Sequence, residues 1–373
     1  MPHVFPAVAL VLFLTKPLGL YIHIPFCLKK CNYCDFYSVA VNDSVKRDYI
    51  KALIREIKQW GDKISRPIDT IYFGGGTPSL LAEFLPEILS TVKASFSVLD
   101  NAEITMEMNP ADNSKEVLEL ALKSGVNRLS IGAQSGNTEE LKVLGRRHTA
   151  EQTAETVKFA KALGFKNISL DIMLGLPDST SESLEKSLEF ITQLAPQHIS
   201  AYILKIEENT VFGKSYDALN LPDEDETADQ YLQMCEYLKN NGYEHYEISN
   251  FCENGMMSRH NLKYWELDDY LGIGPSAHSL VDGERFYYDR KLTDFIKGSS
   301  PLPDGKGGSE EERIMLNLRL NKGLKIKFNQ TLSKKCQLFE KNGLIKVEND
   351  HISLTDKGML LSNSIITEIL ECK

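Results

Sequence analysis

The 373-residue sequence lacks an apolar stretch long enough to span a membrane. Its most apolar segment, residues 1–15, falls short of the ~20 residues that a membrane-spanning helix needs. The segment also lacks the basic start and the small-residue cleavage site of a secretory signal. We therefore expect residues 1–17 to be an apolar leader ahead of the first domain, with weak membrane contact as the alternative.

The sequence also lacks an excess of basic residues. Its net charge is -10, whereas a protein that binds the phosphate backbone relies on a basic surface, so we expect no nucleic-acid partner. The seven cysteines do not suit a disulfide framework, because their number is odd and three of them lie within eight residues. This cysteine usage indicates a reducing compartment, and we expect the protein to be cytoplasmic.

The sequence does contain a repeated alternation of short β-branched or aromatic runs with amphipathic helical stretches. This alternation predicts βα units and a parallel sheet. The six expected strands are 20–25, 70–73, 103–108, 128–132, 168–174 and 198–204. The expected helices between them are 44–60, 80–95, 114–123, 150–163 and 180–194. The predicted fold class is α/β, with right-handed crossovers that curl the units into a partial (β/α)6 barrel.

The expected domain boundaries place the barrel at 18–245, a connecting region at 246–300 and a C-terminal domain at 301–373. A further helix is expected at 225–241, an irregular aromatic-rich connection at 250–283 and a Pro- and Gly-rich linker at 301–308. Beyond the linker, the expected helices are 309–320, 330–341 and 356–370, and the expected strands are 344–347 and 351–354. This order predicts a small winged-helix-like α+β domain.

Three cysteines follow the first predicted strand with the spacing C-x3-C-x2-C, namely Cys27, Cys31 and Cys34. A cuboidal iron-sulfur cluster normally takes four thiolates, so three leave one iron open to a methionine-derived ligand. A closed zinc site needs four ligands, and the nearest candidate for a fourth is His23. The pattern favours a 4Fe-4S cluster over zinc. It resembles the defining motif of the radical S-adenosylmethionine (SAM) superfamily, whose cluster binds SAM through one iron.

Polar residues recur at the C-terminal ends of the predicted strands, where the functional groups of an α/β barrel gather. They include the turn Gly74-Gly75-Gly76-Thr77-Pro78, then Thr105, Glu107 and Asn109 on one strand face, then Gln134, Arg146 and Asp171. Glycines let a backbone approach a ligand closely, and an inward carboxylate is costly unless something binds it. Structural alternatives stay open, such as an ion pair between Glu107 and Arg146.

These residues resemble the SAM-binding set of the coproporphyrinogen-dehydrogenase-like branch of the superfamily. The Gly-Gly-Gly-Thr-Pro turn is similar to the element that binds the methionyl amino group. By this resemblance Glu107 and Asp171 hold the ribose and the amino end, and Arg146 neutralises the carboxylate. The implied SAM contacts are Tyr21, Tyr33, Gly75, Gly76, Thr77, Glu107, Gln134, Arg146 and Asp171.

Two kinds of protein in this branch differ at the cysteine loop. The oxygen-independent coproporphyrinogen III oxidases continue C-x2-C-x-C and carry a longer N-terminal region, whereas Phe36 occupies the last position here. The Cys34-Asp35-Phe36 ending instead resembles the HemW family of heme chaperones. The segment from Arg259 to Trp265 matches the HNxxYW element of that family, and the resemblance extends from Gly19 nearly to the C-terminus.

The HNxxYW element implies contact with heme. His260 offers an imidazole for iron, and Tyr264 and Trp265 offer flat aromatic faces for a porphyrin. With Asn261, these four residues are the heme candidates. The structural alternative is a packed aromatic corner around a hydrogen-bonded histidine.

Three functions follow from these observations. The first is a heme chaperone that delivers heme to client hemoproteins of respiration, among them membrane-associated ones, and that carries a SAM-coordinated 4Fe-4S cluster and forms a homodimer. The second is an oxygen-independent coproporphyrinogen III oxidase, which Phe36 disfavours. The third is an iron-sulfur sensor whose winged domain binds nucleic acid, which the acidic charge disfavours despite a local lysine cluster. Whether the chain cleaves SAM stays open.

Overall fold

The computed structural model describes residues 16–40, 43–110 and 115–372. Most of the expected leader, residues 1–15, lies outside the described residues. Lys16 and Pro17, the end of that expected leader, belong to the fold. Lys16 Nζ lies 2.7 Å from the Asp268 carboxylate, and the Pro17 carbonyl accepts a hydrogen bond of 3.3 Å from Lys263.

The expected parallel sheet is present, and it confirms the predicted α/β fold class. Six strands lie side by side in chain order, and every neighbouring pair is parallel. They are β1 (Leu18–Ile24), β2 (Ile68–Gly75), β3 (Val98–Met108), β4 (Arg128–Gln134), β5 (Ile168–Leu174) and β6 (His198–Ile203). Their apolar side chains, such as Ile22, Phe73 and Leu129, are fully buried in one continuous core.

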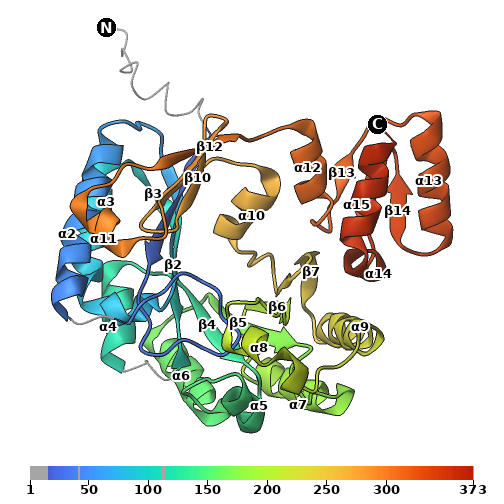
Figure 1. The fold of residues 1–373 in the computed structure, drawn as a ribbon, viewed down its shortest axis with the longest axis horizontal. Coiled ribbons are helices and arrows are strands. Elements are labelled where there is room, and N and C mark those ends of the chain that lie inside the picture. Colours follow the sequence, from blue (N-terminus) through green and yellow to red (C-terminus); the bar gives the residue numbers. More distant parts are fainter. Residues whose placement is uncertain (1–15, 41–42, 111–114, 373) are drawn as a thin grey trace, which may run out of the picture.

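Helices connect these strands and cover the outer face of the sheet (Figure 1). They are α2 (Asp43–Gly61), α3 (Leu85–Ser95), α4 (Lys115–Ser124), α5 (Thr138–Val143), α6 (Ala150–Leu163) and α7 (Ser181–Gln193). The single helix expected at 80–95 is divided into the 3-10 helix η1 (Pro78–Phe84) and α3. Pro86 lies in the first turn of α3, where its missing N–H leaves no helical hydrogen bond unmade. A capping box between Thr149 and Gln152 begins α6.

Short strands extend the sheet at both edges. After α8 (Val211–Lys214), η3 (Tyr216–Ala218) and α9 (Glu224–Asn240), strands β7 (Glu244–Glu247) and β8 (Asn250–Cys252) continue from β6. At the other edge, β9 (Tyr270–Ile273) pairs parallel with β1, and β10 (His278–Val281), β11 (Glu284–Tyr287) and β12 (Leu302–Lys306) follow it. The expectations of an irregular connection at 250–283 and a linker at 301–308 are therefore wrong. These strands have three to five residues each, and the hairpin signal at Asp282-Gly283, between β10 and β11, was overlooked.

The C-terminal residues form a small domain to the right of the barrel in Figure 1. Its elements are α12 (Glu310–Asn317), β13 (Leu324–Lys325), α13 (Gln330–Lys341), β14 (Ile345–Glu348), β15 (His351–Leu354), α14 (Asp356–Leu360) and α15 (Ser362–Glu371). As expected, β14 and β15 form an antiparallel hairpin, and Asn349 and Asp350 have positive φ angles at its turn. The closing helix expected at 356–370 is divided at Leu361. Across the described part of the chain, no helix is both long and apolar enough to cross a bilayer.

Candidate functional site

A cavity of about 530 Å³ opens at the C-terminal ends of the parallel strands. Its walls come from the cysteine loop after β1 and from residues of β2, β3, β4, β5 and β6. Cys27, Cys31 and Cys34 all line this cavity, and all three are half-buried free thiols. The structure therefore brings the three predicted cluster ligands to one place.

Backbone contacts fix the cysteine loop from several sides. The Cys27 amide donates to the Val39 carbonyl at 3.2 Å, and the Asn32 amide donates to the Leu144 carbonyl at 3.0 Å. Cys27 Sγ lies 3.4 Å from Thr77 Oγ1, in the glycine turn after β2. The loop is thus held against both the sheet and the turn after α5, which keeps its thiols at the cavity.

The glycine turn approaches its neighbours too closely to tolerate side chains. Gly75 has a φ of +110°, and a Cβ there would lie 2.6 Å from the His23 ring. A Cβ on Gly76 would lie 2.5 Å from the Phe26 carbonyl oxygen. With Thr77, these residues line the cavity, so the turn presents backbone groups to it.

Two half-buried carboxylates, Glu107 of β3 and Asp171 of β5, face the cavity. Glu107 accepts hydrogen bonds from the Tyr72 hydroxyl at 2.8 Å and from the Gly75 amide at 3.1 Å. Asp171 accepts one from the Ser130 hydroxyl at 3.1 Å. Burial raises the pKa of Glu107 to about 7 and also raises the pKa of Asp171. Such a pair suits a ligand that brings an ammonium group and hydroxyl donors.

Arg146 stands beside the cysteine loop rather than beside Glu107. Its guanidinium donates to the Gly132 carbonyl at 2.7 Å and to the Asn109 side chain, and it lies 3.5 Å from Cys31 Sγ. The ion pair between Glu107 and Arg146 that the sequence left open is therefore not the arrangement seen. A cation at this place can meet an anionic ligand group next to the thiols.

The other predicted SAM contacts divide into two groups. Tyr33 and Gln134 line the cavity, and Gln134 has a φ of +68° at the end of β4. Tyr21 is not among the described residues that line the cavity, and its hydroxyl pairs with His23 Nδ1 at 3.0 Å. The geometry therefore does not support direct contact between Tyr21 and a ligand in the cavity.

Two further residues of the cavity, Arg128 and Tyr72, were not predicted from the sequence. Both line the cavity, and Arg128 is only 1% exposed although it is charged. Arg128 lowers the pKa of both Glu107 and Asp171, against the larger effect of their burial. A usable signal was present, because an arginine at the start of the otherwise uncharged strand Arg-Leu-Ser-Ile-Gly-Ala-Gln needs a buried anionic partner.

The HNxxYW element forms α10 (Arg259–Glu266), and His260 is fully buried there. Its Nδ1 lies 2.8 Å from Thr70 Oγ1, and its Nε2 lies 2.8 Å from the Tyr264 hydroxyl. Burial lowers the pKa of His260 to about 3, so the ring is neutral. His260 was expected to offer a nitrogen to heme iron. In this arrangement both ring nitrogens already have hydrogen-bond partners, so neither is free to coordinate iron. The geometry matches the packed aromatic corner that the sequence left as the alternative.

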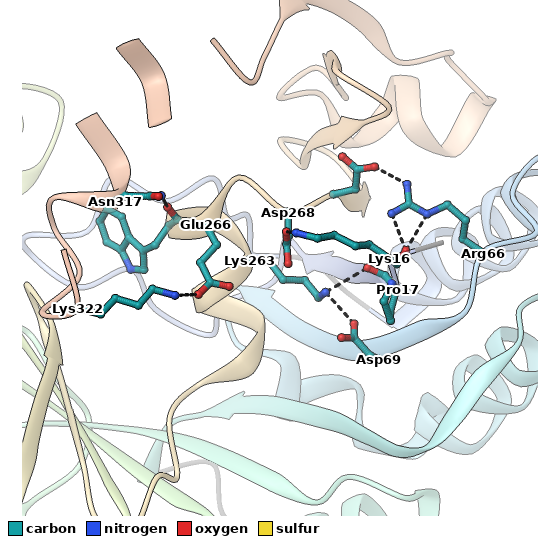
Figure 2. A network of polar contacts seen from close by, with 11 residues as sticks. Lys16, Pro17, Arg66, Asp69, Lys263, Glu266, Asp268, Asn317 and Lys322 are labelled. Atoms are coloured by element: carbon teal, nitrogen blue, oxygen red, sulfur yellow. Dashed lines mark hydrogen bonds and ion pairs between the residues drawn. The ribbon is translucent and has the colours of Figure 1, made fainter. Parts of the chain in front are cut away.

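The remaining heme candidates lie in different environments. Asn261 lines the cavity, whereas Tyr264 and Trp265 are not among the described residues that line it. Figure 2 shows how α10 is anchored on both sides. Lys263 pairs with Asp69 of β2 at 2.9 Å, and Asn317 of α12 donates to the Trp265 carbonyl at 2.6 Å. The element thus joins the barrel to the C-terminal domain.

A second group of possible metal ligands lies outside the residues of this cavity. Ligand atoms of Cys235, His245 and Asp356 lie within 4.8 Å of one another. His245 Nδ1 and Asp356 Oδ1 already pair at 2.9 Å, which joins β7 to the start of α14. This contact accounts for the group as a hydrogen-bonded pair between the sheet and the C-terminal domain.

The fold and the three-cysteine cavity together define a radical SAM protein. The family model described as the Radical SAM superfamily matches residues 21–191, and the one described as the HemN C-terminal domain matches residues 311–361. The chain is 35% identical to the heme chaperone HemW of Lactococcus lactis, over 96% of this chain and 98% of that protein. It is 34% identical to the HemW of Bacillus subtilis, over 94% and 98% respectively. The chain belongs to the HemW family of heme chaperones.

Among solved structures, the chain is similar to the coproporphyrinogen III oxidase HemN from Escherichia coli, a radical SAM enzyme. The TM-score is 0.81, and the match covers 95% of this chain and 90% of the other at 24% identity. This likeness shows that the two proteins share a fold.

Proposed function

We propose that this protein is a cytoplasmic heme chaperone that accepts heme and delivers it to client hemoproteins of respiration. The observation that carries the proposal is the similarity to HemW heme chaperones along nearly the whole chain. Phe36, at the position where the oxidases of the branch carry a further cysteine, supports this function over porphyrinogen decarboxylation. The acidic net charge of -10 supports a partner other than nucleic acid.

We further propose that Cys27, Cys31 and Cys34 hold a 4Fe-4S cluster whose open iron binds SAM. When bound, the cluster supplies single electrons and a chelation site for the amino and carboxylate groups of SAM. The donor set fits this assignment, because three thiols and two half-buried carboxylates share one cavity. Glu107, held by Tyr72 and Gly75, would bind the ammonium group, while Asp171 would bind ribose hydroxyls and Arg146 the carboxylate. Gly76, Thr77, Tyr33 and Gln134 would complete the SAM pocket.

The cluster assignment is tested by anaerobic reconstitution followed by measurement of iron, sulfide and visible absorbance. Replacing any one of the three loop cysteines by Ala should abolish the broad cluster absorbance, because each thiolate holds one iron and its loss would leave two irons without a protein ligand. Cys336→Ala is the matched control, since Cys336 is a free thiol buried in α13. A triple Cys27, Cys31 and Cys34 variant that kept the cluster would contradict the assignment.

A turnover assay distinguishes the chaperone function from the oxidase function. Reconstituted protein would be incubated anaerobically with coproporphyrinogen III, SAM and a strong reductant, and the products examined by chromatography and mass. We expect no protoporphyrinogen while added heme is retained. Turnover would make the protein an oxidase and would refute the chaperone proposal.

A further inference from the structure

The helix α10 reaches the candidate SAM site through one stacked aromatic pair. The imidazole of His260 stacks on the Tyr72 ring with centroids 5.2 Å apart and planes 28° apart. The Tyr72 hydroxyl in turn donates to Glu107 Oε1 at 2.8 Å. Because Tyr72 also abuts Gly74, where a Cβ would lie 2.9 Å from it, its ring has little room to tilt.

We propose that His260 is a positioning residue of the SAM site, which holds the Tyr72 ring so that its hydroxyl orients Glu107. The inference rests on the proposed function, because it takes Glu107 as the group that binds the SAM amino end. It assigns to the HNxxYW histidine a task other than iron coordination. The two hydroxyl partners of His260, on Thr70 and Tyr264, fix the imidazole itself.

The position of His260 is further fixed because α10 is held at its start and along its length. At its start, the amides of Arg259 and His260 donate to the Glu103 carboxylate at 3.2 Å and 3.1 Å. Along its length, Lys263 contacts Asp69 and the Pro17 carbonyl, as Figure 2 shows. A ring held in this way provides a rigid backing for Tyr72.

Loss of this positioning should change the pKa of Glu107, because the hydrogen bond from Tyr72 lowers that pKa against the effect of burial. If Tyr72 tilts away, that pKa rises and Glu107 keeps its proton to higher pH. The other titratable groups that act on Glu107, or on which it acts, are Tyr21, Arg128, Asp171, Tyr202 and Tyr264. Of these groups, Tyr264 loses a hydrogen bond when His260 is replaced with Ala, whereas Tyr72→Phe leaves that bond in place.

The test measures SAM binding to reconstituted protein by calorimetry across pH, after cluster content is matched between variants. His260→Ala should weaken SAM binding about tenfold, the effect of a lost hydrogen bond to a charged group, and should move the pH midpoint of binding upward. Tyr72→Phe should do the same, and the double variant should lose little more, because both act through one contact. His245→Ala is the matched control, since His245 also stacks on an aromatic ring, Phe251, but does not line the cavity.

A variant that keeps a flat ring without imidazole separates packing from iron coordination. His260→Phe combined with Thr70→Val and Tyr264→Phe removes the two hydroxyls that would lose their partner, and it should bind SAM nearly as the parent does. His260→Ala with parental SAM affinity and pH midpoint would overturn the positioning role. If His260→Ala kept parental SAM binding but no longer bound heme, His260 would be a heme ligand and not a positioning residue. A parent protein that binds no SAM at all would overturn the proposed function itself.

Discussion

At the scale of single residues, Glu107 is the most informative side chain of the cavity. Burial raises its pKa from 4.5 to about 7, so the folded protein binds this proton more tightly than the unfolded chain does. Its contribution to stability is therefore present below pH 4.5 and is lost as pH rises through 7. A bound ammonium group would reverse this cost, which couples ligand binding to the protonation of Glu107.

This linkage predicts the pH dependence of SAM binding. Affinity should fall as pH drops below about 7, because protonated Glu107 no longer attracts an ammonium group. Glu107→Gln should weaken binding and remove most of that dependence, as measured by calorimetry from pH 6 to 9. Equal pH dependence in parent and variant would show that another group controls binding.

The glycine turn gives a second prediction at this scale. Gly75→Ala should destabilise the protein by about 3 kcal/mol or more, because a positive φ and a collision with His23 act together. Gly164→Ala, at a φ of +104° with nothing within 4 Å, should cost only about 1–2 kcal/mol. Denaturant unfolding measures both values, and equal losses would mean that the close approach to His23 is unimportant.

Residue spacing predicted part of the site. The C-x3-C-x2-C pattern and the polar strand ends pointed to side chains that the fold does bring to one cavity. The same reasoning could not find Tyr72, because its role depends on its contact with Glu107 from a neighbouring strand. Nor could the HNxxYW motif reveal that both nitrogens of His260 are already hydrogen-bonded, because burial and partners arise only from tertiary packing.

At the scale of elements, periodicity predicted the six parallel strands because each has a buried, β-branched or aromatic run between amphipathic helices. The strands β9 to β12 were missed, although Asp282 and Gly283, which have positive φ angles between β10 and β11, are a two-residue hairpin signal. All five residues of β12 are exposed, and it lies at the outer edge of the sheet, where Pro303 is tolerated. Local sequence therefore identifies the barrel better than its extension.

Capping gives a prediction at the element scale. Thr149→Ala should destabilise the protein by about 1 kcal/mol, because the Thr149 hydroxyl accepts a hydrogen bond from the Gln152 amide in the capping box of α6. Thr149→Ser should retain most of the stability, since it keeps the hydroxyl. Denaturant unfolding compares the two variants, and similar losses would show that the cap contributes little.

At the scale of the whole molecule, contacts of α10, α12 and β7 join the C-terminal domain to the barrel (Figures 1 and 2). The hydrogen bond from His245 lowers the pKa of Asp356, so this pair stabilises the fold above the ordinary pKa of an aspartate, about 4, and loses that effect as pH falls.

Asp356→Asn should therefore cost about 0.5 kcal/mol at neutral pH, because the pair is partly exposed, and nothing at low pH. Asp217→Asn, an exposed residue of η3, is the control. Thermal unfolding from pH 3 to 7 measures both variants. A loss for Asp356→Asn that did not depend on pH would contradict the assigned contact.

Heme transfer tests the central claim most directly. Anaerobically reconstituted protein would be loaded with heme, freed of excess ligand and mixed with a heme-free respiratory hemoprotein, and the absorbance of the client followed with time. We predict that the client acquires heme faster from the loaded protein than from an equal concentration of heme bound to albumin. Transfer no faster than from albumin, or no retention of heme by the protein, would contradict the account of a heme chaperone.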